Sequence, residues 1–222
     1  TSKAIKTPCR ILSLDLAVRS NVKEIIKAIE RYSYDCEDDV NIKMLVNCAG
    51  FGKLGNFATI DEEYTEGMID VNIAALTCLT RDLIPYMKKN SRIIQLASSA
   101  AFMPQPGFAI YAATKSYVLS FSKALGYELK KRNITVTSVC PGPVNTDFFR
   151  IADDGIKSVR PWYKDYFMAA APDVVRQALS DAAKRKEISV YGKSMNMFFV
   201  LTKIIPHSLI IKIMTKLQRT VK

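Results

Sequence analysis

Tyr111 and Lys115 are the residues whose types and spacing most clearly allow chemistry. They stand four positions apart, so on a helix they share one face. An ammonium beside a phenol favours the phenolate and can allow proton exchange nearer neutral pH. Ser98 lies thirteen residues upstream, just past a short apolar run, where its hydroxyl could hold a carbonyl against the phenol. The three residues together predict an acid–base site.

The Tyr-x-x-x-Lys spacing by itself is weak evidence. With 10 Tyr and 21 Lys in 222 residues, about one such pair is expected by chance. A second copy does occur at Tyr127 and Lys131, where it follows Gly126 inside a helical stretch, and we interpret it as a solvated helix face. Tyr111 differs in its context, because it opens a helical pattern shortly after an apolar strand pattern that ends before Ser98.

The sequence has few of the residues that other kinds of catalytic site require. His207 is the only His, so a two-His metal site is excluded and a Ser-His-Asp triad is very improbable. No metal ligands are predicted. The five Cys are odd in number and form no C-x-x-C pair, which favours reduced thiols in the cytoplasm. Cys48 and Cys140 fall in strand-like apolar runs and are interpreted as packing residues.

Strand and helix patterns alternate along the chain, which predicts an α/β protein with a doubly wound, Rossmann-like parallel sheet. Asn21 is the expected N-cap of the first helix. In this arrangement Ser98 and Tyr111 meet at the carboxyl ends of the strands, where such sheets bind ligands. The predicted strands are 10–15, 43–47, 92–97, 134–139 and 188–191, and the predicted helices are 21–34, a pair over 61–89, 111–131 and 172–185.

Four short motifs, in order over residues 10–192, resemble those of the classical short-chain dehydrogenase/reductases. Ser98, Tyr111 and Lys115 match three members of the family's catalytic tetrad. The other matches are Asn47-Cys48-Ala49-Gly50, with Cys48 in place of a second Asn, Asp70-Val71-Asn72, which holds the fourth tetrad member, and Pro141-Gly142-Pro143-Val144-Asn145-Thr146.

The resemblance implies an NAD(P)-dependent oxidoreductase that interconverts a carbonyl and a secondary alcohol by hydride transfer. Tyr111 would be the acid in reduction and the base in oxidation, and Ser98 would hydrogen-bond the carbonyl oxygen. Lys115 would hold the nicotinamide ribose and, with an oxidised nicotinamide, lower the pKa of Tyr111. Asn72 would anchor a water that links Lys115 to solvent.

The resemblance also implies a set of cofactor contacts. Asp15 would meet the adenine and Thr146 the nicotinamide amide. Structural alternatives remain for several residues: Ser98 could cap a strand end, Asn47 could be a turn former, and Asn72 could satisfy backbone groups inside a helix. The full implied set is Asp15, Asn47, Ala49, Gly50, Tyr111, Lys115, Pro141, Gly142, Val144 and Thr146.

One departure from the family is large. The family begins with a strand and a Thr-Gly-x-x-x-Gly-x-Gly turn, and no such glycine cluster occurs here; the match begins at the family's third strand. The residues that choose NAD or NADP are therefore not identifiable. Residues 10–15 would lack a neighbouring strand and 43–47 would have an exposed edge. We therefore expect an N-terminally truncated domain over 1–192, which is a fragment, a truncated gene product, or a protein whose first half-motif is supplied elsewhere.

A second function remains open, namely a catalytically silent remnant that acts as a binding or dimerisation module. In either case a homo-oligomer is expected through the helices at 61–89 and 111–131. The segment 147–170 is rich in aromatic residues and predicts an apolar lid and a small apolar substrate. Its aromatic residues are Phe148, Phe149, Trp162, Tyr163 and Phe167.

The tail, residues 193–222, has a separate character. It carries six of the eleven net positive charges and no acid, and its two apolar helical patterns are broken at Pro206. These helices could pack on the core or on a dimer partner, or could contact anionic lipid through their basic face. No nucleic-acid-binding motif is present, so that partner is not expected. No signal peptide or apolar run of membrane-spanning length is found.

Overall fold

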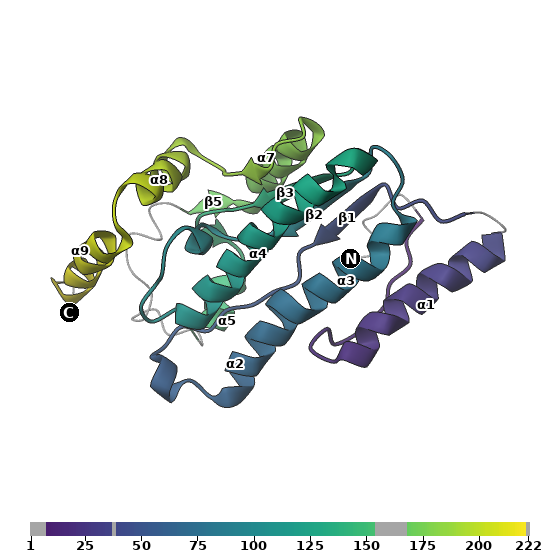
Figure 1. Ribbon diagram of the computed structural model, residues 1–222. Coiled ribbons are helices and arrows are strands. Elements are labelled where there is room, and N and C mark those ends of the chain that lie inside the picture. Colours follow the sequence, from purple (N-terminus) through teal and green to yellow (C-terminus); the bar gives the residue numbers. More distant parts are fainter. Residues whose placement is uncertain (1–7, 37–38, 154–167, 221–222) are drawn as a thin grey trace.

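A four-stranded parallel sheet forms the centre of the protein, for which a computed structural model describes residues 8–36, 39–153 and 168–220. Its strand order is β1-β2-β3-β6 (Figure 1). The strands are short runs of apolar and β-branched residues, which suit a sheet buried between helices. They are β1 (Met44–Asn47), β2 (Arg92–Leu96), β3 (Thr135–Val139) and β6 (Ile188–Ser189).

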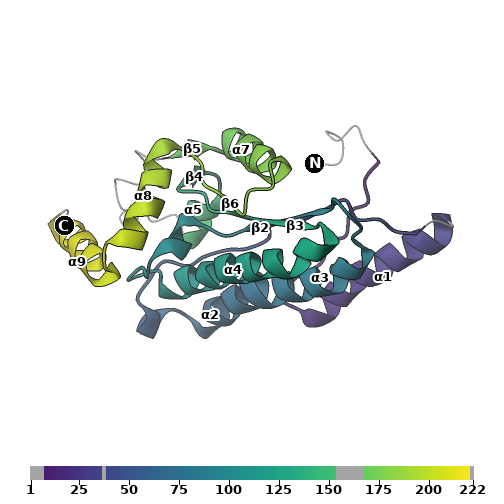
Figure 2. The ribbon, with the colours of Figure 1, turned by 45° about the horizontal axis from the view of Figure 1, so that its top comes forward.

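Helices cover both faces of this sheet, as the prediction of a doubly wound α/β fold requires (Figure 2). α1 (Arg19–Cys36), α2 (Glu62–Ile69), α3 (Leu76–Leu83) and α4 (Ala109–Glu128) lie on one side, and α7 (Ala171–Ala183) lies on the other. The shorter elements are β4 (Val144–Asn145), α5 (Phe148–Ala152) and β5 (Ala169–Ala170), and the tail forms α8 (Lys193–Ile204) and α9 (His207–Thr220), separated at Pro206.

A π-helical segment, Asp70–Ala75, joins α2 to α3, so the predicted helix pair over 61–89 is one continuous helix. Single π-turns inside α-helices shift the hydrogen-bond ladder by one residue and occur often at functional sites. Asn72 lies in this segment and is fully buried. A short 3-10 helix, Ile84–Tyr86, then ends the run, with Pro85 in its first turn.

The strand predicted at residues 10–15 is wrong. Residues 8–15 form no strand, and Ile11 and Leu12 are exposed. The physical reason is that an isolated extended segment leaves its backbone groups to water unless a neighbouring strand pairs with them. Asn21 is not the N-cap of α1 either, because α1 begins two residues earlier. The side-chain amide of Asn21 instead donates a hydrogen bond to the backbone carbonyl oxygen of Asp15, 2.9 Å away.

β1 lies at the edge of the sheet, which confirms the expected exposed edge. Its residues alternate between the two faces. Leu45 packs among residues of α1 and α3, whereas Met44 and Val46 are 41% and 50% exposed. α7 packs instead against Ile94 and Val139 of β2 and β3. One face of β1 is therefore open to solvent.

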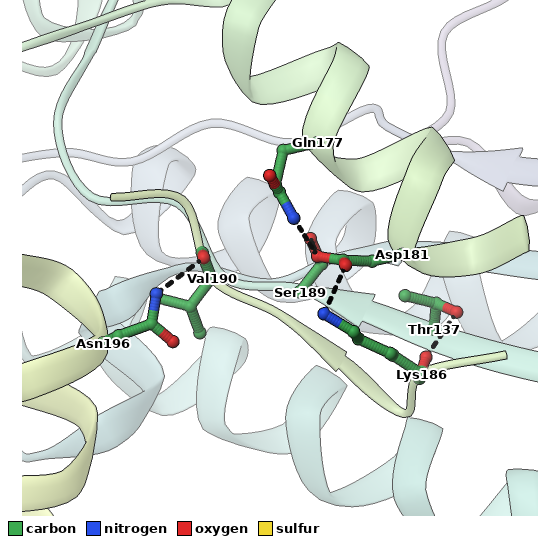
Figure 3. A network of polar contacts seen from close by, with 7 residues as sticks. All are labelled: Thr137, Gln177, Asp181, Lys186, Ser189, Val190 and Asn196. Carbon is green, nitrogen blue, oxygen red and sulfur yellow. Dashed lines mark hydrogen bonds and ion pairs between the residues drawn. The ribbon is translucent and has the colours of Figure 1, made fainter. Parts of the chain in front are cut away.

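A buried carboxylate ties α7 to β6 (Figure 3). Asp181 accepts hydrogen bonds from the side chains of Gln177 and Ser189, each at 2.8 Å, and forms an ion pair with Lys186 at 2.7 Å. Burial by itself would raise the pKa of Asp181, but these three donors outweigh it and lower the pKa below its ordinary value. The short strand β6 is thus anchored by a buried polar network.

The tail helices extend from one end of the molecule (Figures 1 and 2). Phe198 and Phe199 of α8 pack against Phe102, with ring centroids 6.3 Å and 4.7 Å away. Among the described residues, no helix has the length and apolar character needed to span a membrane. The expected boundary between residues 192 and 193 stays a prediction.

Candidate active site

A cavity of about 350 Å³ lies beyond the carboxyl ends of β2 and β3. Its size is in the range of small-ligand sites, and most of its wall is apolar. It brings together eight of the residues singled out from the sequence: Gly50, Ser98, Tyr111, Lys115, Pro141, Gly142, Val144 and Thr146.

Tyr111 stands in the first turn of α4, which begins just after a tight turn at Gly107, a residue with a φ of 75°. The side chain is only 6% exposed. Its ring stacks on Phe108 at 4.4 Å between centroids and lies 5.2 Å from the ring of Phe148. The phenol is therefore held by aromatic packing, with its polar end toward Ser98.

Burial raises the pKa of Tyr111 to about 12, and the hydrogen bond with Ser98 lowers it only in part. A phenolate in an apolar wall loses its hydration, which sets the direction of this shift. The lowered pKa that we expect for Tyr111 when an oxidised nicotinamide is bound stays a prediction.

Lys115 is 3% exposed and lies one helical turn after Tyr111. Its ammonium is 5.6 Å from the centroid of the Tyr111 ring and donates a hydrogen bond to the Leu96 carbonyl oxygen at 2.8 Å. Burial lowers the pKa of Lys115 to about 8, and the nearby Cys48 and Cys140 side chains offset this only in part. One hydrogen bond leaves two ammonium protons available for other acceptors.

Ser98 serves two functions at the end of β2. Its hydroxyl oxygen accepts a hydrogen bond from the Ala100 amide at 3.1 Å and so caps the 3-10 helix Ser99–Phe102. The same hydroxyl is near enough to the Tyr111 hydroxyl to lower the pKa of Tyr111. Ser98 is therefore a cap at the end of the strand, as the structural alternative proposes. The cap holds the Ser98 hydroxyl near the phenol of Tyr111.

Asn72 lies behind the cavity wall. Its amide donates to the Phe51 carbonyl oxygen at 2.9 Å and to the Thr114 hydroxyl at 3.1 Å, and its oxygen accepts from the Phe51 amide at 3.1 Å. A Cβ on Gly50 would come within 2.8 Å of the Asn72 oxygen and 3.2 Å of the Lys115 nitrogen. The side chain thus holds the loop after β1 against α4, and its role toward water stays a prediction.

Three predicted cofactor residues do not line the cavity. The Asn47 amide donates to the Thr80 hydroxyl and to the Gln95 side-chain oxygen, each at 2.9 Å, inside the core. Asp15 is exposed and accepts from the Ala17 amide of its own turn. Ala49 is exposed and does not line the cavity, although its sequence neighbours Cys48 and Gly50 do.

Sequence reasoning missed or misplaced several wall residues. Cys48 was interpreted as a packing residue, but it is exposed and lines the cavity because it follows the last residue of β1. Gln105 and Phe108 were not singled out, although Phe108 lies three residues before Tyr111 and so shares its helix face. Of the proposed aromatic lid, Phe148 and Phe149 line the cavity, whereas Trp162, Tyr163 and Phe167 lie outside the described residues.

Comparison with known proteins identifies the family of this fold and site. A family model described as short chain dehydrogenase matches residues 2–156. The chain belongs to the short-chain dehydrogenase family. Two curated relatives are an uncharacterised oxidoreductase of Staphylococcus epidermidis, 32% identical over 157 residues, and the human dehydrogenase/reductase SDR family member 4, 34% identical over 99 residues. These matches cover 69% and 44% of this chain.

Two solved structures show the same fold, and the first is a short-chain dehydrogenase. One from Sphingobium yanoikuyae in complex with NADPH is 27% identical, with a TM-score of 0.65 over 79% of this chain and 64% of that chain. A 4-hydroxyisoleucine dehydrogenase complexed with NADH is 20% identical, with a TM-score of 0.70 over 85% of this chain and 80% of that chain. The chain spans 65% of the Staphylococcus relative and 36% of the human one.

The wall residues fit the nicotinamide end of a dinucleotide and not the whole of it. Lys115 is a buried donor with two ammonium protons left over from its hydrogen bond to Leu96, and it lines the same cavity as Tyr111 and the loop Pro141–Val144. For the adenine end, Asp15 is exposed and absent from the cavity wall, and the sequence contains no glycine-rich phosphate turn. The described residues thus fit only the nicotinamide half of a cofactor site.

Proposed function

We propose that this short-chain dehydrogenase is an NAD(P)-dependent oxidoreductase that interconverts a carbonyl and a secondary alcohol, with Tyr111 as the acid and base. The observation that carries the proposal is the position of Tyr111, buried in the cavity wall with Ser98 at its hydroxyl and Lys115 one turn away. The family match and the NADPH bound to a 27% identical relative support it.

In carbonyl reduction, Ser98 donates a hydrogen bond to the substrate oxygen and orients it toward the Tyr111 hydroxyl. Tyr111 then gives its proton to that oxygen as negative charge develops there. In alcohol oxidation the phenolate takes the proton back. The reduced or oxidised nicotinamide, when bound, supplies or accepts the hydride.

Lys115 supports Tyr111 and binds the cofactor. Its two remaining ammonium protons would hold the ribose hydroxyls of a bound dinucleotide, while its charge stabilises the phenolate. Gly50, Pro141, Gly142, Val144 and Thr146 would form the remaining contacts at the nicotinamide end, because they line the same cavity.

The proposed substrate is a small apolar ketone or secondary alcohol. The rings of Phe108, Phe148 and Phe149 lie in the cavity wall, and Val174 and Val175 close it from α7. Such a wall offers few hydrogen-bond partners to a polar substrate, so polar groups away from the reacting oxygen would remain unsatisfied.

Replacement of Tyr111 by Phe tests this proposal. Removal of the hydroxyl should lower turnover of an apolar ketone by about 10²-fold or more. Nucleotide affinity should change little, because Lys115 still holds the ribose. Turnover at the wild-type rate would contradict the assignment.

The proposed assembly is a homo-oligomer that forms through the α2–α3 helix and α4. Support comes from the outer face of α4, where Ala113, Tyr117, Ser120 and Ala124 are exposed and three of the four side chains are small. We further propose a reducing compartment, the cytoplasm, because Cys9, Cys48, Cys78 and Cys140 are all unpaired among the described residues. The alternative of a catalytically silent module is not favoured by the preserved acid–base cluster.

A further inference from the structure

The outer face of α8 is apolar, which is unusual for a surface helix. Met197, Val200, Leu201 and Ile204 are 63%, 51%, 40% and 73% exposed. The opposite face already packs on the body through Phe198 and Phe199 and through buried Thr202. The exposed residues are therefore not the core-facing side of the helix.

α9 follows α8 at the same end of the molecule (Figure 1). Leu209 and Ile213 are 50% and 52% exposed and stand four residues apart on one helix face. We call the six residues on the two helices the tail face: Met197, Val200, Leu201, Ile204, Leu209 and Ile213. A patch of this kind marks a contact with another molecule or a membrane.

Positive charge lies on the same two helices as the tail face. Lys193, Lys203 and Lys212 are exposed, and the Lys203 ammonium lies 4.1 Å from the centroid of the Phe199 ring. The whole segment 193–222 has six cationic residues and no acid, whereas residues 1–192 have a net charge of only +5. An apolar surface with basic neighbours and no acid is complementary to an anionic lipid headgroup layer over acyl chains.

We propose that α8 and α9 bind the surface of an anionic membrane through the tail face and its lysines. A second copy of this chain is a poorer partner, because its tail would present the same six cations and no acid to pair with them. Each apolar residue of the tail face would enter the headgroup–acyl boundary, and each lysine would remain at the headgroups.

Vesicle co-sedimentation of the full chain tests this binding. The probes are vesicles of phosphatidylcholine alone and of phosphatidylcholine with phosphatidylglycerol. The protein should pellet with the anionic vesicles and remain in the supernatant with the neutral ones, and binding should weaken as salt is raised. Absence of pelleting with anionic vesicles, or equal pelleting with both, would overturn the proposal.

Two pairs of substitutions test the surface itself. Lys193→Glu with Lys212→Glu removes charge at the tail, and Leu201→Gln with Ile204→Gln removes exposed apolar area. Each pair should weaken binding by about tenfold or more. The matched control is Lys23→Glu with Lys89→Glu, exposed residues outside the tail, which makes the same change in net charge.

The control pair should bind within about twofold of the wild type, since screening limits charge effects to about a Debye length. An equal loss in the control would reduce the effect to net charge and overturn the proposal. A second result would also overturn the proposal. If the Leu201→Gln/Ile204→Gln protein keeps its vesicle binding but sediments at a lower mass than the wild type, the tail face of the wild type is covered by a second copy of the chain.

Discussion

Burial opposes ionisation of both members of the Tyr111–Lys115 pair. It raises the pKa of the phenol to about 12 and lowers the pKa of the ammonium to about 8. In the proposed mechanism, proton transfer at neutral pH therefore depends on the charge of an oxidised nicotinamide as well as on Lys115. The spacing of the two residues predicted that they would lie together, whereas only the structure shows how dry their surroundings are.

The pH dependence of stability should report the burial of Lys115. Between pH 8 and 10.5 the unfolded chain keeps a proton on this residue that the folded chain has lost, so stability rises with pH in that window. Lys115→Met lacks this contribution. Urea unfolding at pH 7, 8.5 and 10 should therefore show the wild type gaining stability relative to the variant as pH rises. Parallel curves for the two proteins would refute the lowered pKa.

Gly50 and Gly126 should respond in opposite ways to replacement by Ala. A Cβ on Gly50 meets the Asn72 oxygen at 2.8 Å, so the loop must move and the free energy of unfolding should fall by about 1–3 kcal/mol. A Cβ on Gly126 meets Val136 at an ordinary 3.7 Å within α4, and stability should rise by about 0.5–1 kcal/mol. Denaturant midpoints measure both effects, and a Gly50→Ala protein as stable as Gly126→Ala would contradict the packing described.

At the scale of elements, the short strand β6 depends on the α7 carboxylate. Asp181→Asn replaces an acceptor by a donor that faces Gln177, Ser189 and Lys186, so the free energy of unfolding should fall by about 2 kcal/mol. The loss should be full above about pH 5 and should shrink as pH falls below about 4, since the ordinary pKa of this carboxyl is lowered in the fold.

Asp39→Asn is the matched control for Asp181. Asp39 is 94% exposed at its side chain and its ion pair with Lys88 is 3.7 Å long, so the change should cost less than about 0.5 kcal/mol. Thermal unfolding of the two variants and the wild type would measure the difference. Equal effects would show that burial of the Asp181 network is unimportant.

Local sequence patterns correctly predicted several helices and strands. They failed where the secondary structure of a segment depends on the strands that lie beside it in space. The runs at 43–47 and 134–139 form strands because they pair with β2, whereas the equally apolar run at 10–15 has no strand beside it. The π-helical segment at Asp70–Ala75 was not predictable, because a one-residue shift in hydrogen bonding leaves an apolar stripe nearly unchanged. The position of Cys48 in the cavity wall was likewise not predictable, because it depends on which strand ends lie side by side in the folded sheet.

At the scale of the whole molecule, the exposed stripe of α4 should decide assembly. Ala124→Arg places a long cation on this stripe and should shift the protein to monomers, because two such faces could no longer approach closely. Ala183→Arg, at the exposed end of α7, is the control and should leave the mass unchanged. Sedimentation velocity checks both, and an unchanged oligomer in Ala124→Arg would place the contact elsewhere.

The molecule as a whole combines the buried Tyr111–Lys115 pair with an open β1 face and an exposed Asp15. We propose that Tyr111 transfers the proton in a nicotinamide-dependent reaction. The most direct measurement is NAD(P)H oxidation with an apolar ketone, by wild type and Tyr111→Phe, after each has been titrated with NADH and NADPH. The account predicts binding by both proteins and a turnover at least about 10²-fold lower in the variant. Failure of the wild type to bind either nucleotide, or equal turnover by the two proteins, would contradict it.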